Sequence, residues 1–140
     1  MRFTRLAASL ILFAVILLPF PVFATEPIDP AALSAAENFL HLLDNDDYQT
    51  AWAQTNIINQ GYTTYPEWFK KVLAVRPHLG HVIERSLSKT SLHTSWVGLP
   101  DGEYVRLSFS TTFLNKAISL ETVLLNREGN FWSVGSYHLR

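Results

Sequence analysis

One long alternating segment sets the fold class of this chain. It follows the turn dipeptide Asp101-Gly102 and covers residues 104–113. Residues suited to a protein interior come at every second place, and they are Val105, Leu107, Phe109, Thr111 and Phe113. The residues that alternate with them are Tyr104, Arg106, Ser108, Ser110 and Thr112. A sustained period of two is typical of a β-strand with one face against a core. We therefore expect a half-buried strand here, with antiparallel strands beside it.

Three other segments have the composition of strands. They cover residues 82–89, 118–125 and 131–139. Residues 90–98 fit a continuation of the first of these strands through a bulge or a bend. Residues 126–130 have a glycine late in the segment, which predicts a hairpin loop between the last two strands.

The chain before these strands has helical periodicity instead. From Ala32 to Leu43 apolar residues recur three or four places apart, after an aspartate and a proline that suit a helix start. A second helix is predicted around Tyr48, with Asp46 as its cap and Gln49 as the reciprocal partner.

A third helix is predicted from the capping box Thr64–Glu67 to the residue before Pro77, because that position disfavours the helical conformation. The order of helices followed by strands indicates an α+β fold. We predict three N-terminal helices packed on a strongly twisted four-stranded antiparallel sheet, which together form a cone with one open end.

The first 24 residues have the pattern of a secretory signal peptide. Arg2 and Arg5 precede an apolar run from Leu6 to Leu18, and a small-residue cleavage pattern ends at Ala24. An uncleaved membrane anchor is the alternative, but the apolar run is shorter than a spanning helix needs. We therefore expect cleavage near Ala24, a periplasmic or secreted location, a single domain over residues 25–140, and no stable membrane span after cleavage.

Charge and cysteine content narrow the function classes. The chain has 11 Lys and Arg against 12 Asp and Glu, and two of the basic residues lie in the predicted signal peptide. The remaining chain is mildly acidic without a basic run, which argues against nucleic-acid partners. There is no cysteine, so disulfides and cysteine-ligated metals are excluded. No motif for a cofactor is present, and we expect none.

Glu121 is the carboxylate most worth attention. It falls within a predicted strand among leucines and valines, where a glutamate is uncommon unless it is paired. One interpretation is an ion pair with Arg85 or Arg106 on another strand. The other is a carboxylate that lines the open end of the cone and acts as a general base, with Tyr104, Tyr137 or Tyr62 as hydrogen-bond donor.

Two other features of the sequence resemble binding sites. His78 and His81 have the spacing of a weak metal pair, but no third ligand is evident, so we predict no metal site. Trp96 lies in the irregular segment before the Asp101-Gly102 turn, beside Val97 and Leu99. It either forms an exposed apolar rim that contacts a ligand or partner, or it folds back over the core. The candidate binding residues are therefore Arg85, Trp96, Tyr104, Arg106 and Tyr137.

Several separate stretches resemble one bacterial family. They are Leu43-Asp44, Tyr48 with Ala51-Trp52, Trp68, Arg76 with Leu79-Gly80, Arg85, Leu99 to Val105, Thr112-Phe113 with Lys116, Glu121 to Val123, and Trp132-x-Val134-x-x-Tyr137. Together they resemble the exported family known as domain of unknown function 4019. The resemblance implies a cystatin-like or nuclear-transport-factor-like cone fold, and it implies no activity. The chain departs from the family in the last strand, where Gly135 comes one place earlier than usual.

Two functions follow from these observations. The first is a non-enzymatic exported domain that binds a protein partner or a small apolar ligand, through the mouth of the cone or the outer sheet face. Self-association through the sheet into a homodimer is compatible with it. The alternative is a small isomerase or hydratase with Glu121 as its acid/base. The absence of any other catalytic signature favours the binding domain.

Overall fold

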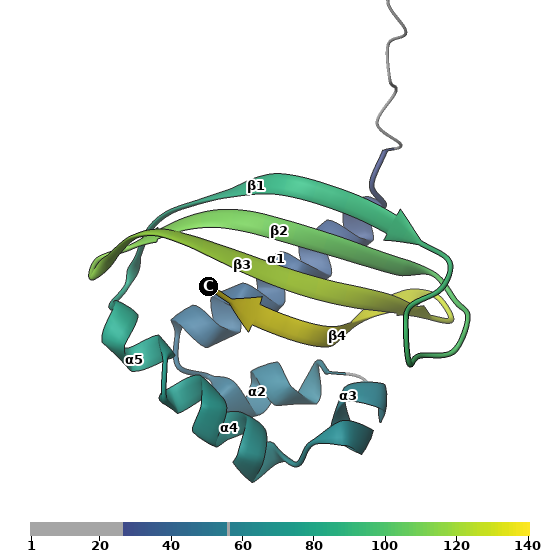
Figure 1. The fold of residues 1–140 in the computed structure, drawn as a ribbon, viewed down its shortest axis with the longest axis horizontal. Helices are drawn as coiled ribbons and strands as arrows, with labels where there is room; N and C mark the ends of the chain where they lie inside the picture. The colour runs from purple at the N-terminus through teal and green to yellow at the C-terminus, as the bar shows by residue number, and fades with distance from the viewer. Residues whose placement is uncertain (1–26, 56) are drawn as a thin grey trace, which may run out of the picture.

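The computed structural model describes residues 27–55 and 57–140 (Figure 1). Within them the helices are α1 (Pro30–Asp44), α2 (Tyr48–Ala53), α3 (Ile57–Tyr62), α4 (Tyr65–Leu73) and α5 (Arg76–Leu79). The strands are β1 (Val82–His93), β2 (Tyr104–Phe113), β3 (Lys116–Glu128) and β4 (Phe131–Leu139), and they form one antiparallel sheet in chain order. The predicted α+β class and four-stranded antiparallel sheet are confirmed.

Two expectations about the N-terminal part have different outcomes. The predicted signal peptide, residues 1–24, lies outside the described residues. The count of three helices is too low, because the described part of the chain contains five. The capping box is present, since the Glu67 carboxylate accepts a hydrogen bond from the Thr64 backbone N–H at 2.9 Å. In the described part, no helix combines the length and the apolar character that crossing a bilayer requires.

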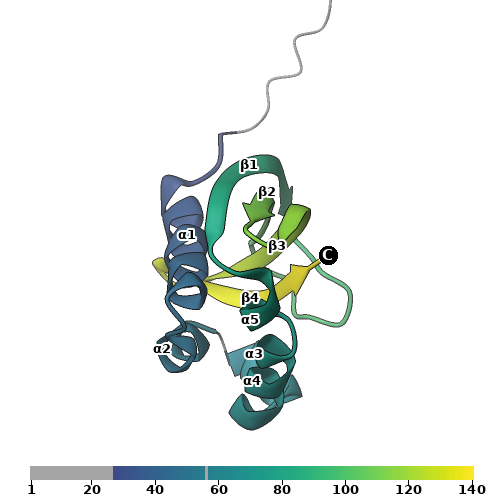
Figure 2. The same cartoon turned by 90° about the vertical axis from the view of Figure 1, so that its left-hand side faces the viewer.

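The core lies between α1 and one face of the sheet, which we call the inner face (Figure 2). The helix contributes one apolar stripe at helical spacing, and the strands contribute alternate residues, as their periods require. The central members are Ala32, Ala36, Phe39, Leu40 and Leu43 of α1 and Val105, Leu107, Phe109, Val123, Leu125 and Val134 of the sheet. The alternation predicted for β2 is therefore confirmed, and the opposite side of the sheet is the outer face.

Helices α2 and α4 extend this core with a cluster of aromatic side chains. Trp52 and Trp68 have ring centroids 5.4 Å apart, and Tyr65 stacks on Phe69 at 5.5 Å. Tyr48 meets Phe69 edge to face. Such pairs stabilise beyond the area they bury, so this cluster fixes α4 and the start of α5 beside the end of β4.

Bulges in the two edge strands decide which side chains point inward. In β1, Leu87 pairs with Phe109 and Lys89 with Ser108, so Ser88 is an extra residue. In β4, Leu125 pairs with Val134 and Leu124 with Ser136, so Gly135 is extra. An extra residue reverses the face on which the following residues lie. A second register shift in β1, between Val82 and Glu84, combines with the bulge at Ser88 to make the pattern of residues 82–89 uneven, and the strand runs on to His93.

Gly80 makes the tight connection from α5 to β1 possible. Its φ is +73°, and a Cβ at this position would lie 2.9 Å from the Cβ of Leu114. Glycine alone adopts this backbone freely and leaves room for that approach. The connection therefore holds Arg76 of α5 close to the end of the sheet where β2 and β3 meet.

Candidate functional site

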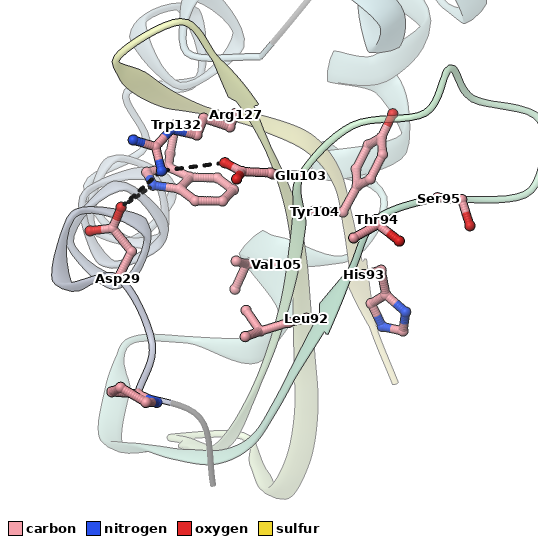
Figure 3. A pocket seen from close by; sticks show the side chains of 11 residues that line it. Asp29, Leu92, His93, Thr94, Ser95, Glu103, Tyr104, Val105, Arg127 and Trp132 are labelled. Carbon is pink, nitrogen blue, oxygen red and sulfur yellow. Dashed lines mark hydrogen bonds and ion pairs between the residues drawn. The ribbon is translucent and has the colours of Figure 1, made fainter.

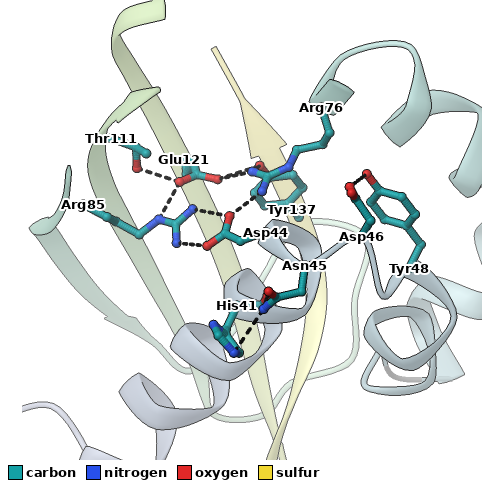
Figure 4. A network of polar contacts seen from close by, with 10 residues as sticks. All are labelled: His41, Asp44, Asn45, Asp46, Tyr48, Arg76, Arg85, Thr111, Glu121 and Tyr137. Carbon is teal, nitrogen blue, oxygen red and sulfur yellow. Dashed lines mark hydrogen bonds and ion pairs between the residues drawn. The ribbon is translucent and has the colours of Figure 1, made fainter. Parts of the chain in front are cut away.

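Glu121 is the centre of a buried ionic network on the inner face (Figure 4). Its side chain has no exposed surface. One carboxylate oxygen, Oε1, accepts hydrogen bonds from Arg76 Nη1 at 3.0 Å and from the Tyr137 hydroxyl at 2.7 Å. The other, Oε2, accepts from Arg85 Nε at 2.7 Å and from the Thr111 hydroxyl at 2.6 Å. Each oxygen of Glu121 therefore has two donors.

Asp44 supplies the second carboxylate of the network. Arg85 donates to it through both terminal nitrogens, from Nη1 to Oδ2 at 2.6 Å and from Nη2 to Oδ1 at 3.0 Å. Arg76 Nη2 also donates to Asp44 Oδ1. Each arginine thus bridges both carboxylates, and two positive charges balance two negative ones. Bidentate arginine–carboxylate contacts of this kind are among the strongest hydrogen bonds in proteins.

The network draws one residue from each strand and one from each of two helices. Arg85, Thr111, Glu121 and Tyr137 come from β1 to β4 in order, Asp44 ends α1, and Arg76 begins α5. Glu121 lies opposite Phe109, so it faces the core. Tyr137 lies opposite Val123 and faces inward only because of the bulge at Gly135. The network therefore joins the helix layer to all four strands at one end of the sheet.

Burial and the neighbouring charges together set the protonation states of the network. Burial alone would raise the pKa of Asp44, but the hydrogen bonds and charges of Arg85 and Arg76 outweigh it and hold that pKa below its usual range. Burial raises the pKa of Tyr137, and the neighbouring Glu121 carboxylate raises it further. At neutral pH Asp44 is therefore ionised, and Tyr137 is a neutral hydroxyl that can donate.

The geometry limits what chemistry this cluster can do. A carboxylate has about four lone-pair positions for hydrogen bonds, and the four donors to Glu121 use them. A general base needs an oxygen within reach of a substrate proton. The two arginines occupy the oxygens that a cation would need, and in the described part of the chain no three His, Asp or Glu side chains gather as a metal-ligand set. The network is thus arranged as a rigid tie between elements.

The sequence-predicted residues fall into two groups. Arg85 and Tyr137 meet Glu121 in the network, as the ion-pair interpretation expected for Arg85. Arg106 was a wrong choice of partner, because it pairs with Leu124 and lies on the outer face, away from Glu121. Tyr104 and Trp96 also lie on that side of the sheet.

Trp96 and Tyr104 pack together where the loop before β2 meets the outer face. The Tyr104 hydroxyl donates to the Pro100 carbonyl at 2.6 Å, and the ring is buried. Trp96 is half-buried, meets His93 edge to face at 4.9 Å and lies 6.5 Å from Tyr104 between ring centroids. Trp96 therefore covers the outer face instead of the core, while its neighbour Val97 is fully open to solvent at 99 % exposure.

Three members of the network were missed by sequence reasoning. They are Asp44, Arg76 and Thr111. Asp44 ends α1 and Arg76 begins α5, and nothing local in the sequence shows that they meet. A signal was nevertheless available, since both lie in stretches that carry the family resemblance, as do Arg85, Glu121 and Tyr137.

A surface groove lies at the other end of the sheet (Figure 3). It has a volume of about 630 Å³ between the start of α1, the end of β1 and the start of β2. Its charged groups pair with each other, since Arg127 is 3.7 Å from Asp29 and 3.3 Å from Glu103, and it lies over the ring of Trp132. Trp132 Nε1 donates to Asp29 at 2.9 Å. These contacts tie the cap of α1 to the β3–β4 hairpin.

A smaller hollow of about 250 Å³ lies on the outer face, and we call it the outer hollow. Trp96, Leu120 and Leu124 form its apolar part. Arg106, His138 and Arg140 form its basic part. The hydroxyl residues Thr122 and Ser136 complete the lining. Among the described residues, no acidic side chain lines it.

Fold and site together define a class: a small α+β domain whose helices are tied to an antiparallel sheet by a charge-balanced buried network. The family described as "Protein of unknown function (DUF4019)" matches residues 35–137. The chain belongs to this family. Comparison with the curated proteins finds no match, and comparison with the solved structures finds none either.

The lowered pKa of Asp44 predicts how stability depends on pH. Because the folded state holds this pKa below its unfolded value, the stabilisation is present above about pH 4 and is lost as the pH falls through the folded pKa. Asp44→Asn should lower the free energy of unfolding by about 2 kcal/mol at pH 7. The difference from wild type should shrink steadily from pH 5 to pH 2, measured by urea unfolding at each pH.

Asp101→Asn is the matched control for this experiment. It removes the same charge from an exposed turn residue. A wild-type minus Asp44→Asn difference that stayed constant over this pH range would contradict the role assigned to Asp44.

Proposed function

We propose that the chain is an exported, non-enzymatic binding domain with a cystatin-like or nuclear-transport-factor-like cone fold. We further propose that it works in the periplasm or outside the cell, after cleavage near Ala24. Its binding surface is the outer face of the sheet, around the outer hollow. The inner side provides the rigid support, because the ionic network fixes the curvature of the strands that carry this face.

One observation carries the proposal: the four donors to Glu121 leave its carboxylate no free position. The alternative function, an isomerase or hydratase, requires this group to exchange a proton with a substrate. Doing so at either oxygen would require displacing one of its two donors, which are Arg76 and Tyr137 at Oε1 and Arg85 and Thr111 at Oε2. A buried charge deprived of its partners is strongly destabilising. Glu121 therefore suits a structural role and not general acid–base catalysis.

The outer face has the features of a contact surface. Leu120 is 41 % exposed and Ile118 is 81 % exposed on this side, and Val97 projects from the adjoining loop. Leu124 forms a nearly buried floor between them and Trp96. Exposed apolar groups next to a hollow with a few polar groups are typical of binding sites.

The test is native mass spectrometry of the mature protein, isolated gently from its own cell envelope as wild type and as two variants. Leu120→Arg alters the outer face, and Leu87→Arg alters the inner face at the β1 edge. Leu87 is a matched control because it is 38 % exposed, against 41 % for Leu120. We expect an added mass or a bound partner with wild type and Leu87→Arg, and its loss with Leu120→Arg. Retention by Leu120→Arg, or three bare proteins, would overturn the proposal.

A further inference from the structure

We propose that the outer hollow binds a small amphipathic anion, with an apolar body and a carboxylate head group. This inference rests on the proposed function and names the ligand class of the same face. It starts from the order of side chains across three strands.

Strand β3 forms the floor of the outer hollow. Leu124, Thr122 and Leu120 come at every second place, so they point to the same side. Leu124 and Thr122 are almost fully buried, and Leu120 is partly open. Ser108 of β2 and Thr122 lie within hydrogen-bond distance at 3.4 Å, so the one polar group of the floor already has a partner. The floor thus offers an apolar strip to a ligand.

Arginines stand on both sides of this strip. Leu124 has Arg106 of β2 as its neighbour on one side and Ser136 of β4 on the other. Thr122 has His138 beside it on β4. Leu120 exchanges both backbone hydrogen bonds with Arg140 at 3.0 Å, which places Arg140 beside it. Since neighbouring strands lie about 5 Å apart, long arginine side chains reach a ligand on the strip from either side.

The two arginines of the outer hollow, Arg106 and Arg140, take no part in the ion pairs that hold the described part of the fold together. Within residues 27–55 and 57–140, Arg106 and Arg140 form no ion pair, although every other arginine there does. Both are exposed. Arginine is the side chain best suited to hold a carboxylate in two parallel hydrogen bonds. Without an acidic side chain in the lining, the charge of the site favours an anion.

Trp96 closes one end of the outer hollow and limits the size of the ligand. It is held there by His93 and Tyr104, on the side next to Arg106. A volume of about 250 Å³ is just below the range usual for drug-sized ligands. A short acyl chain fits such a space, whereas a protein segment would have to cover the face beyond it. The half-buried indole would then pack against the chain.

The probe is decanoate below its micellar concentration, titrated into the mature protein by calorimetry and followed by tryptophan fluorescence. We expect saturable binding of one decanoate per chain. Decanol, which has the same chain without the charge, should bind at least about tenfold more weakly, because a hydrogen bond to a charged group is lost. Decyl phosphate tests whether a phosphate head group replaces the carboxylate, and equal or tighter binding would overturn the carboxylate assignment.

The matched variants are Arg106→Glu and Lys116→Glu. Both change the charge equally, but Lys116 lies at the start of β3, outside the outer hollow. Arg106→Glu should weaken decanoate binding at least about tenfold, and Lys116→Glu should leave it within about twofold. Trp96→Phe should remove the fluorescence change while calorimetric binding persists. Equal effects of the two charge reversals would overturn the site.

Two results separate this inference from the proposed function. If decanoate fails to bind while Leu120→Arg still removes the native adduct or partner, the ligand class is wrong and the outer face remains a binding surface. Dimerisation through the outer face, detected by sedimentation and abolished by Leu120→Arg, would also overturn the ligand class. If Leu120→Arg changes neither the adduct nor decanoate binding, both proposals fail.

Discussion

Glu121→Gln should lower the free energy of unfolding by about 3 kcal/mol, and Glu121→Ala by up to about 5 kcal/mol. Both variants leave Arg76 and Arg85 buried with only Asp44 to balance them. Glutamine keeps the volume, and its single carbonyl oxygen can still accept from the donors of one carboxylate oxygen, such as Tyr137 at the Oε1 position, so its effect is the smaller of the two. For a domain of this size the melting temperature should fall by roughly 10–20 °C. Chemical denaturation and calorimetry measure both quantities.

Glu84→Gln is the control for these variants. Glu84 precedes Arg85 on β1, is exposed, and forms no ion pair with a described residue. Its substitution should change the free energy of unfolding by no more than about 0.5 kcal/mol. If Glu121→Gln had as small an effect as this, the network would not be the tie that its contacts indicate.

Phe39→Ala should cost about 3–5 kcal/mol of stability, the range for removing a large buried aromatic side chain. Phe39 lies in the middle of α1, is fully buried, and meets Tyr137 edge to face at 5.8 Å. Its loss opens a cavity between the helix and β4 and also frees the ring of Tyr137. Phe39→Leu keeps most of the volume and should cost no more than about 1.5 kcal/mol.

A double-mutant cycle with Tyr137→Phe tests whether the core and the ionic network support each other. Because Phe39 packs against the ring that positions the Tyr137 hydroxyl in the network, the effects of Phe39→Ala and Tyr137→Phe should differ from additivity by about 0.5–1.5 kcal/mol. Additive effects would mean that the ring of Tyr137 is held by the network alone.

The sheet was predictable because its signal is local. The alternation of β2 fixes its period and its inward face without any tertiary information. The bulges are harder, since a single extra residue such as Ser88 only blurs the pattern. For residues 90–98 we predicted that the strand continues through a bulge or a bend. β1 does continue past the bulge at Ser88, and it ends at His93.

The short helices were missed because they have too few turns to show a period. α3 has six residues and α5 has four. Pro77 was read as the end of a helix, but it lies in the first turn of α5, where its missing N–H costs nothing. The cap of α2 is Asp47 and not Asp46. Asp46 instead has a positive φ of 59° and accepts from the Tyr48 hydroxyl at 2.5 Å.

Only the part of the candidate site that lies on strands could be predicted from local sequence. A glutamate among leucines indicates a buried partner, and Arg85 was found because it too lies in a strand. Arg106 could have been excluded as a partner of Glu121 from the alternation of β2 alone, because it lies on the face opposite to Phe109 and Thr111. Asp44 and Arg76 lie at helix ends, and only the tertiary packing brings them to Glu121.

The ionic network also joins parts of the chain that are distant in sequence. Asp44 and Arg85 are 41 positions apart, and Arg76 and Tyr137 are 61 apart. Because such contacts require closing long loops, we expect them to form after local hairpins during folding. Interactions absent from the folding transition state slow unfolding and leave the refolding rate almost unchanged. The network should therefore give the domain a long lifetime against proteases, set by how rarely it opens, even where its equilibrium stability is ordinary.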